Sequence, residues 1–256
     1  MPWDPSQYLK FGDQRLRPAV DLLNRIDIDD PKEVYDLGAG AGNVTRLLKA
    51  RWPEARVTGV DDSREMLARA AAAAPQIIWQ HADVGTWQPA VAADVIFSNA
   101  ALQWVDDHER LLLTLLSQLA VGGVLAVQLP HNFSAPSHTA ISEAAKSGPW
   151  RTTLEPLLRP APVAEPSVYF DLLASRVSSL DMWETEYLQV LEGEAPVREW
   201  TKGTWLRPLL DALIEPQRSE FEAYYTRLIA RDYPQRPDGR TLFPFRRLFI
   251  VARVAG

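Results

Sequence analysis

Three aspartates stand where buried strands of this sequence are expected to end. Asp36 lies two residues before a glycine-rich turn at residues 38–42, Asp61 closes a second apolar run and Asp83 follows a third. Because the carboxyl ends of parallel strands meet at one edge of a sheet, we expect these carboxylates to lie together. Carboxylates accept hydrogen bonds from hydroxyl and amino groups and attract cations, but they repel a pyrophosphate. The pattern favours a cationic ligand that carries a diol and an amine.

The turn at residues 38–42 has the glycine spacing GxGxG. Glycine permits a tight turn and lets a ligand lie against the backbone. Asn43 stands where the dinucleotide fingerprint GxGxxG requires glycine or alanine, so the spacing disfavours an NAD-dependent oxidoreductase. A glycine turn alone also occurs as a structural connection, and a single aspartate also occurs as a helix cap. The prediction therefore depends on all three aspartates occurring at successive strand ends.

The elements that must position these groups alternate along the first half of the chain. Short apolar runs predict strands, and the segments between them carry apolar residues at helical spacing. This alternation predicts a mostly parallel sheet with right-handed crossovers, which is a Rossmann-like α/β fold. Ser63 is the expected cap of one helix. The predicted strands are residues 33–37, 56–60, 77–81, 94–98 and 124–129, and the predicted helices are residues 15–28, 44–52, 63–74 and 107–119.

The second half of the chain is less regular and is rich in proline, tryptophan and arginine. We expect its last strands to complete the sheet and its helices to form a cap over the ligand edge. The predicted domains are an N-terminal lid and helix at 1–30, including Trp3 and Tyr8, a cofactor-binding core at 31–130, and cap helices with the final strands at 131–256. The predicted elements beyond residue 130 are strands at 177–190 and 245–254 and helices at 198–205, 206–213 and 216–233.

The composition limits the possible partners. The 256 residues carry a formal net charge of -6, which argues against a nucleic-acid binder, and they include no cysteine, which excludes disulfides and thiolate chemistry. No apolar run approaches the roughly 18 residues that a membrane span needs. His81, His108 and His138 show no metal-ligand spacing. We expect a cytoplasmic monomer that has no metal site and binds neither nucleic acid nor membranes.

Five segments within residues 33–130 together resemble the motifs of class I methyltransferases. The letters VYDLGAGAG at 34–42 are similar to the first motif, GVD at 59–61 to the second and ADV at 82–84 to the third. The letters DVIFSN at 94–99 resemble the fourth motif, and GGVL at 122–125 resembles the entry to the fifth strand. This resemblance implies a seven-stranded sheet whose last strand runs antiparallel, with S-adenosylmethionine as methyl donor.

The three aspartates have expected roles toward S-adenosylmethionine. Asp61 is expected to accept hydrogen bonds from both ribose hydroxyls and Asp83 from the adenine amino group, while Asp36 orients the turn and helps to hold the amino-acid end. The predicted cofactor-binding residues are Asp36, Gly38, Gly40, Asp61, Asp62, Asp83, Val84, Asn99 and Trp104.

Nearly the whole chain also resembles the trans-aconitate 2-methyltransferase family, whose members esterify a small polycarboxylic acid. The similar segments include WDPSQYL at 3–9, NAALQW at 99–104, LRP at 206–208 and RLFIVAR at 247–253. The resemblance implies that the products are the monomethyl ester of trans-aconitate and S-adenosylhomocysteine. One departure follows Pro130, where the letters HNF replace the expected Asp-Asn-Trp.

Methyl transfer to a carboxylate needs no general base, because a carboxylic acid with a pKa of about 4 is already ionised at neutral pH. The protein contributes proximity, in-line orientation and a water-poor enclosure. Arginine suits the carboxylates of the substrate, and His131 is the residue expected to orient the substrate beside the methyl group. The predicted substrate-binding residues are Arg207, Arg247, Trp205 and Tyr169, followed by Arg176 and Arg246. Each of these residues also has an ordinary alternative as a surface charge, a loop histidine or a packing aromatic.

Other functions stay open at the level of the sequence. A methyltransferase for another small acid, or for a malonyl thioester carrier, would have the same donor site. A catalytically silent module would bind S-adenosylmethionine without turnover. A nucleic-acid methyltransferase is disfavoured because residues 98–101 read SNAA, which lacks the Asn/Asp-Pro-Pro-aromatic pattern that holds a flipped base.

Overall fold

The computed structural model describes residues 12–256, with side chains from Leu16 onward. The predicted lid residues Trp3 and Tyr8 lie outside the described residues. The first described helix, α2 (Gly12–Leu23), contains Pro18 and buries Ala19 and Leu22. It ends at Leu23, five residues before the end of the helix that the sequence predicted at 15–28.

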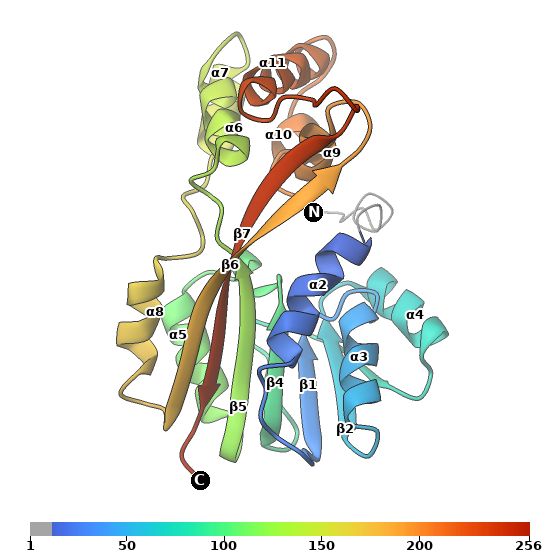
Figure 1. The fold of residues 1–256 in the computed structure, drawn as a ribbon, viewed down its shortest axis with the longest axis vertical. Helices are drawn as coiled ribbons and strands as arrows, with labels where there is room; N and C mark the ends of the chain where they lie inside the picture. The colour runs from blue at the N-terminus through green and yellow to red at the C-terminus, as the bar shows by residue number, and fades with distance from the viewer. Residues whose placement is uncertain (1–11) are drawn as a thin grey trace. The chain divides into compact units, whose positions relative to one another are not determined.

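The described residues form one seven-stranded sheet in the order β3-β2-β1-β4-β5-β7-β6 (Figure 1). Strands β1, β2, β3, β4 and β5 pair in parallel, whereas β7 runs antiparallel to β5. The predicted Rossmann-like fold with an antiparallel last strand is therefore confirmed. The strands are β1 (Glu33–Leu37), β2 (Arg56–Asp61), β3 (Ile78–His81), β4 (Ala93–Asn99), β5 (Leu119–Pro130), β6 (Ser179–Leu191) and β7 (Thr241–Arg253).

Helices cover both faces of the sheet. Helix α3 (Asn43–Arg51) packs against β2, α4 (Arg64–Ala73) against β3 and α5 (His108–Ser117) against β5, with α3 in front of the sheet and α5 behind it in Figure 1. Ser63 caps α4 as predicted, because its hydroxyl accepts the N–H of Met66. The central strands β1, β4 and β5 therefore lie largely buried between two helical layers, and the carboxyl edge of the sheet is formed by the loops that follow β1, β2, β3 and β4.

The start of β5 differs from the sequence prediction. The strand begins at Leu119, five residues before the predicted start, and passes through Gly122 and Gly123. Gly122 has φ +76°, and a Cβ on Gly123 would lie 2.8 Å from the carbonyl oxygen of Ala93. These glycines allow the strand to bend and to approach its neighbour closely, and they lie within β5 rather than at its start.

Three helices in the second half were not predicted. They are α6 (Pro136–Lys146), the short α7 (Arg151–Leu154) and α8 (Pro166–Leu173). Both α6 and α8 begin with a proline in their first turn, where proline costs no hydrogen bond. Pro136 and Pro166, two of the prolines that made this region look irregular in the sequence, are therefore helix starts.

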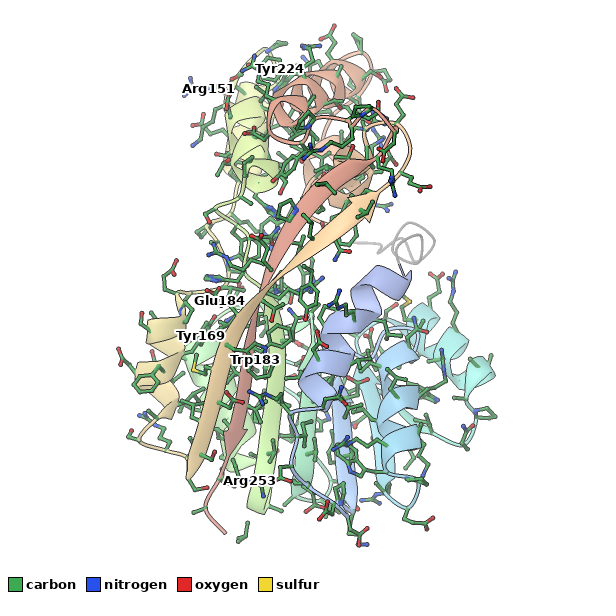
Figure 2. All side chains as sticks on the ribbon, in the orientation of Figure 1. Arg151, Tyr169, Trp183, Glu184, Tyr224 and Arg253 are labelled. Atoms are coloured by element: carbon green, nitrogen blue, oxygen red, sulfur yellow. The ribbon has the colours of Figure 1, made fainter. Side chains whose placement is uncertain are left out.

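The chain divides into two compact units. The sheet unit contains residues 15–130, 162–185 and 247–256, and the described remainder, mainly 131–161 and 186–246, forms the helical unit. In the sheet unit, Trp183 of β6 stacks on Phe249 of β7 with ring centroids 4.7 Å apart (Figure 2). In the helical unit, an aromatic core includes Trp150, Phe221 and Phe243.

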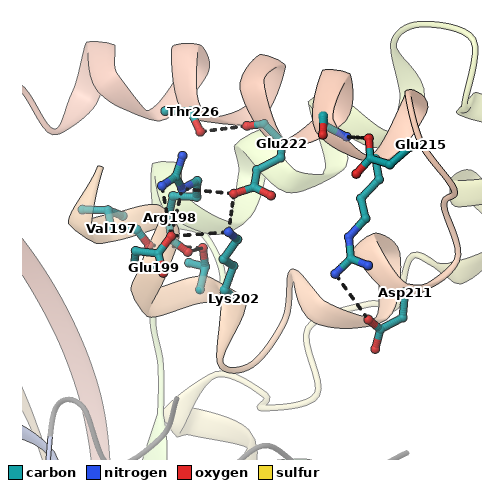
Figure 3. A network of polar contacts seen from close by, with 11 residues as sticks. Val197, Arg198, Glu199, Lys202, Asp211, Glu215, Glu222 and Thr226 are labelled. Atoms are coloured by element: carbon teal, nitrogen blue, oxygen red, sulfur yellow. Dashed lines mark hydrogen bonds and ion pairs between the residues drawn. The ribbon is translucent and has the colours of Figure 1, made fainter. Parts of the chain in front are cut away.

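Ion pairs join two helices of the helical unit. Arg198 on α9 (Pro196–Lys202) lies 3.0 Å from Glu199 and 3.3 Å from Glu222 on α11 (Gln217–Asp232), and Lys202 pairs with the same two carboxylates (Figure 3). Because these side chains are partly exposed, each pair contributes only about 0.2–1 kcal/mol. The network therefore fixes the orientation of α9 on α11 more than it stabilises the fold.

Candidate active site

In the glycine turn after β1, a neighbouring side chain packs against one glycine, whereas no atom of the described residues fills the space beside another glycine. The N–H groups of Gly38 and Ala39 both donate to the carbonyl oxygen of Val60, at 2.8 and 2.9 Å, which fixes the turn against β2. A Cβ on Gly38 would lie 2.1 Å from the Cβ of Ala101, whereas a Cβ on Gly40 would meet nothing within 4 Å. Gly40 is therefore the position where backbone is open to a ligand.

Asp61 connects this turn to the end of β2. Its Oδ2 accepts the N–H of Gly40 at 2.8 Å, and its Oδ1 accepts the N–H of Ser63 at 2.9 Å. Burial raises the pKa of the Asp61 carboxyl above its ordinary value, and the two backbone hydrogen bonds oppose that rise. Each carboxylate oxygen has a further lone pair, so Asp61 can still accept from a diol. Its neighbour Asp62 is exposed.

Asp36 is buried below the turn. It is 2% exposed, and the Thr45 hydroxyl of α3 donates to its Oδ2 at 2.6 Å. Burial raises the pKa of Asp36 to about 7, while the hydrogen bond from Thr45 lowers it and the nearby Asp61 raises it further. This contact ties the end of β1 to α3, and the role of Asp36 in orienting the turn stays a prediction.

The third aspartate and a tryptophan complete this side of the edge. Asp83 is exposed and accepts the N–H of Gly85 at 2.8 Å, and Val84 beside it is half-buried. The ring of Trp79 lies 2.4 Å from where a Cβ would stand on Gly42 or on Gly59. Both glycines therefore make room for Trp79, a packing relationship that the sequence did not indicate.

The carboxyl end of β4 carries strained backbone and a buried acceptor. Ala100 has φ +53°, a left-handed conformation that costs a non-glycine residue energy and often marks functional sites. The Oδ1 atom of Asn99 is buried and has no hydrogen-bond partner among the described residues. Three residues after this bend, the side-chain amide of Gln103 donates to the carbonyl oxygen of Ala100 at 2.7 Å. Trp104 follows and is 46% exposed.

One predicted arginine lies inside the sheet unit beside a glutamine that the prediction missed. Arg247 of β7 is 4% exposed, and its Nη1 donates to Oε1 of Gln128 at 3.0 Å. Gln128 of β5 is fully buried. Its signal in the sequence is a single amide within the apolar run of residues 124–129.

Tyr169 occupies a buried position on α8. Its ring is 1% exposed, and its hydroxyl lies 2.6 Å from Nδ1 of His108 and accepts the N–H of Ala164 at 3.0 Å. Burial raises the pKa of Tyr169 to about 12 and lowers that of His108. These contacts pack Tyr169 into the sheet unit, and its role in substrate binding stays a prediction. Arg176, near the end of the same segment, donates to the carbonyl of Leu172.

The other predicted substrate residues belong to the helical unit. His131 is buried. Its backbone N–H donates to the carbonyl oxygen of Arg246 at 2.9 Å, and the side-chain Nε of Arg246 donates to the carbonyl oxygen of His131 at 3.1 Å. Trp205 packs edge-on against the rings of Phe133 and His138. Arg207 begins α10 (Arg207–Asp211) and lies 3.4 Å from Asp211. Their roles toward a substrate stay predictions.

Two further features of the described residues bear on the site. They contain no group of three or more metal-ligating side chains close enough to hold an ion. None of their helices is both long and apolar enough to cross a membrane.

Comparisons with known proteins identify the fold and the family. Residues 34–123 match the family described as Methyltransferase domain. The phosphoethanolamine N-methyltransferase 2 of Haemonchus contortus superposes with a TM-score of 0.56 at 14% identity, covering 94% of this chain and 53% of that one. The YcgJ protein of Bacillus subtilis superposes with a TM-score of 0.58 at 14% identity, covering 94% and 99%. At these identities the two structures share the fold alone.

Full-length relatives are much more similar in sequence. The trans-aconitate 2-methyltransferase of Azoarcus sp. (strain BH72) is 49% identical over 98% of each chain. Those of Rhodopseudomonas palustris (strain BisB18) and Agrobacterium fabrum (strain C58 / ATCC 33970) are 46% and 45% identical, covering 98% of this chain and 98% and 99% of theirs. The resemblance found in the sequence is therefore confirmed, and this chain belongs to the trans-aconitate 2-methyltransferase family.

Proposed function

We propose that this protein transfers the methyl group of S-adenosylmethionine to a carboxylate of trans-aconitate, giving the monomethyl ester and S-adenosylhomocysteine. The observation that carries this proposal is the 2.8 Å hydrogen bond from Gly40 to Asp61. It places a carboxylate that can accept from a ribose diol beside open backbone at the carboxyl edge of the sheet. Membership in the trans-aconitate 2-methyltransferase family supports the choice of acceptor.

The residues of this edge fit the chemical groups of the cofactor. Asp61, with Asp62 next to it, would accept from the ribose hydroxyls, and Asp83 with Val84 would receive the adenine. Asp36 would hold the turn from below. Gly38 and Gly40 would bring the backbone close to the amino-acid end, with Asn99 and Trp104 at the end of β4 completing the site. When bound, S-adenosylmethionine supplies an electrophilic methyl group on a sulfonium.

The chain's part in the reaction is to bind and orient the acid. A carboxylate of the substrate is ionised at neutral pH and needs no proton removed, so no side chain has to serve as a base. The guanidinium of Arg247 is buried, so its charge is screened less by water than a surface charge would be. Such a cation offsets the cost of moving a carboxylate out of water.

We also propose that the protein acts as a cytoplasmic monomer and binds neither nucleic acid nor membranes. A formal net charge of -6 opposes binding to polyanions, and a chain without cysteine is compatible with a reducing compartment. Sedimentation analysis of the purified protein tests the oligomeric state.

Turnover of labelled S-adenosylmethionine against a panel of acids tests the proposed reaction. The panel includes trans-aconitate, cis-aconitate, citrate, isocitrate and a malonyl thioester. Methyl ester formation on trans-aconitate, with weaker activity on the other acids, is the expected result. Preference for another acid would overturn the choice of acceptor and leave the methyltransferase standing. Tight binding of S-adenosylhomocysteine without turnover on any acid would favour a silent binding module.

A further inference from the structure

Two amide side chains with buried polar atoms stand on neighbouring strands at the carboxyl end of the β4–β5 pair. Asn99 and Gln128 are register partners on these parallel strands, so their side chains lie on the same face of the sheet. Oδ1 of Asn99 and Nε2 of Gln128 are both buried, and neither has a hydrogen-bond partner among the described residues. Gln128 itself is 0% exposed. A buried amide donor without an acceptor is rare in folded proteins, because leaving it unpaired is costly.

Arg247 fixes the direction of the Gln128 amide. In the β5–β7 ladder Gln128 is opposite Phe249 and Pro130 is opposite Arg247, which puts Gln128 and Arg247 on the same face. Arg247 is a donor only, so the atom of Gln128 that lies 3.0 Å from its Nη1 must be the carbonyl oxygen. The amide nitrogen therefore points away from Arg247 and offers its N–H groups to another acceptor.

This donor lies beside apolar rings and beside one positive charge, and both features favour the binding of a carboxylate. Phe249 stacks with Trp183 next to Gln128, so water has little access to this part of the face. A neutral donor in such surroundings forms a stronger hydrogen bond to an ionised acceptor than it would in water. The guanidinium of Arg247 adds a positive charge that stabilises an anion at the same place.

We propose that Gln128 is a specificity-determining residue of the proposed reaction, on which this inference rests. Its Nε2 donates to one carboxylate of the acid, while Arg247 holds the amide and supplies the positive charge. This carboxylate is one that is not esterified. A hydrogen bond and a neighbouring cation withdraw electron density from the oxygens and make them poorer nucleophiles. The pair thus selects an acid that carries a further carboxylate besides the reacting one.

Two substitutions of Gln128 test the proposal in the full-length protein. Gln128→Met removes the donor at similar volume, and Gln128→Glu replaces it with an acceptor that repels a carboxylate. The matched control is Gln118→Met, because Gln118 precedes β5 at the opposite edge of the sheet and also has a buried amide oxygen without a partner among the described residues. Its own amide nitrogen donates to the carbonyl of Trp87.

The primary measurements are KM and kcat for trans-aconitate and for two dicarboxylates, glutaconate and itaconate. Each dicarboxylate lacks one of the three carboxylates of trans-aconitate. Titration calorimetry of trans-aconitate in the presence of S-adenosylhomocysteine measures binding without turnover. In both Gln128 variants we expect KM and Kd for trans-aconitate to rise about ten- to hundredfold, as for loss of a hydrogen bond to a charged group. The preference for trans-aconitate should fall by a similar factor over the dicarboxylate that lacks the carboxylate bound by Gln128, and should stay unchanged over a dicarboxylate that retains it. Affinity for S-adenosylhomocysteine should be unchanged in both Gln128 variants. The Gln118→Met variant should keep the KM, kcat and Kd of the wild-type protein.

The result that overturns the proposal is an unchanged KM, Kd and acid preference in Gln128→Met while the wild-type protein esterifies trans-aconitate. The amide would then serve only the packing of the sheet. Failure of the proposed function would be recognised in the wild-type protein, which would then not methylate trans-aconitate. If Gln128→Glu does not fold, Gln128→Met with intact binding of S-adenosylhomocysteine decides the outcome.

Discussion

Asp61 accepts the backbone N–H of Gly40 at 2.8 Å, and this hydrogen bond ties the end of β2 to the turn after β1. The same carboxylate accepts the N–H of Ser63, the cap of α4. One side chain therefore fixes both the loop that approaches the cofactor and the start of the following helix. These two hydrogen bonds fix the direction of the carboxylate that we propose as the acceptor for the ribose.

Replacement of Asp61 is expected to weaken cofactor binding. Asp61→Ala removes the proposed acceptor of two ribose hydroxyls and releases Gly40, so affinity for S-adenosylhomocysteine should fall by about 2–3 kcal/mol. Titration calorimetry measures this change. Asp94→Ala is a matched control, since Asp94 accepts the N–H groups of Lys32 and Glu33 at the opposite edge of the sheet. Equal losses of affinity in the two variants would contradict a specific role for Asp61.

The raised pKa of Asp36 has a consequence for stability. Burial raises this pKa from 3.8 to about 7 in the folded protein, so between these values the unfolded chain releases a proton that the folded protein retains. The contribution of Asp36 to stability is therefore complete below pH 3.8 and is lost as the pH rises through about 7. Asp36→Asn should remove this loss, which amounts to about 1.4 kcal/mol per pH unit over that window.

Urea denaturation of the wild-type protein and Asp36→Asn at several pH values between 4 and 8 measures the effect. The difference between the two free energies of unfolding is the quantity to follow, because it cancels the titration of the other carboxylates. A difference that does not depend on pH would show that Asp36 is ionised in the folded protein across this range.

The contact between Gly38 and Ala101 predicts unequal effects of two alanine substitutions in the turn. Gly38→Ala and Gly40→Ala both place alanine at positive φ, which costs about 1–2 kcal/mol. Only Gly38→Ala also forces a Cβ to within 2.1 Å of Ala101, and overpacking adds about 1–3 kcal/mol. Ala101→Gly in the Gly38→Ala background should recover the second part of the loss. Chemical denaturation of the double-mutant cycle checks this, and additive effects would refute it.

Local patterns were sufficient to predict the parallel strands and the aspartates at their ends, whereas the seven strands and the antiparallel last strand followed from the resemblance to class I methyltransferases. Each of the strands before residue 100 is a short apolar run, and Asp36 and Asp61 stand at fixed offsets from the glycine turn. Ser63 has the expected capping role for the same local reason. These features need no knowledge of which segments meet in space.

The features that escaped prediction depend on tertiary contacts. A side chain at Gly42 or Gly59 would clash with Trp79, and one at Gly123 would clash with the backbone of β4. Gln128 became a candidate only through its contact with Arg247, 119 positions further along the chain. The prolines that open α6 and α8 were ambiguous because proline is typical of both loops and first helical turns.

His138 provides the last prediction, which concerns stability in acid. Its ring is enclosed in the helical unit by the rings of Phe133 and Trp205 and by the hydroxyl of Ser137, at 3.2 Å from Nδ1. Burial lowers the pKa of His138 from 6.5 to about 4, because the charged imidazolium would lose its water. Below pH 6.5 the unfolded chain binds a proton that the folded protein excludes. The contribution of His138 is therefore complete above that pH and is lost as the pH falls toward 4.

His138→Gln should remove this acid-dependent loss, of about 1.4 kcal/mol per pH unit between the two pKa values. At neutral pH the variant should be somewhat less stable than the wild type because the glutamine packs less well against the two rings. Free energies of unfolding at pH 7.5 and pH 5, compared with those of His81→Gln at an exposed position, measure the difference. If His138→Gln and the wild type lose equal stability on acidification, the His138 ring takes up a proton in the folded protein, and the enclosure by Phe133 and Trp205 must open to admit water.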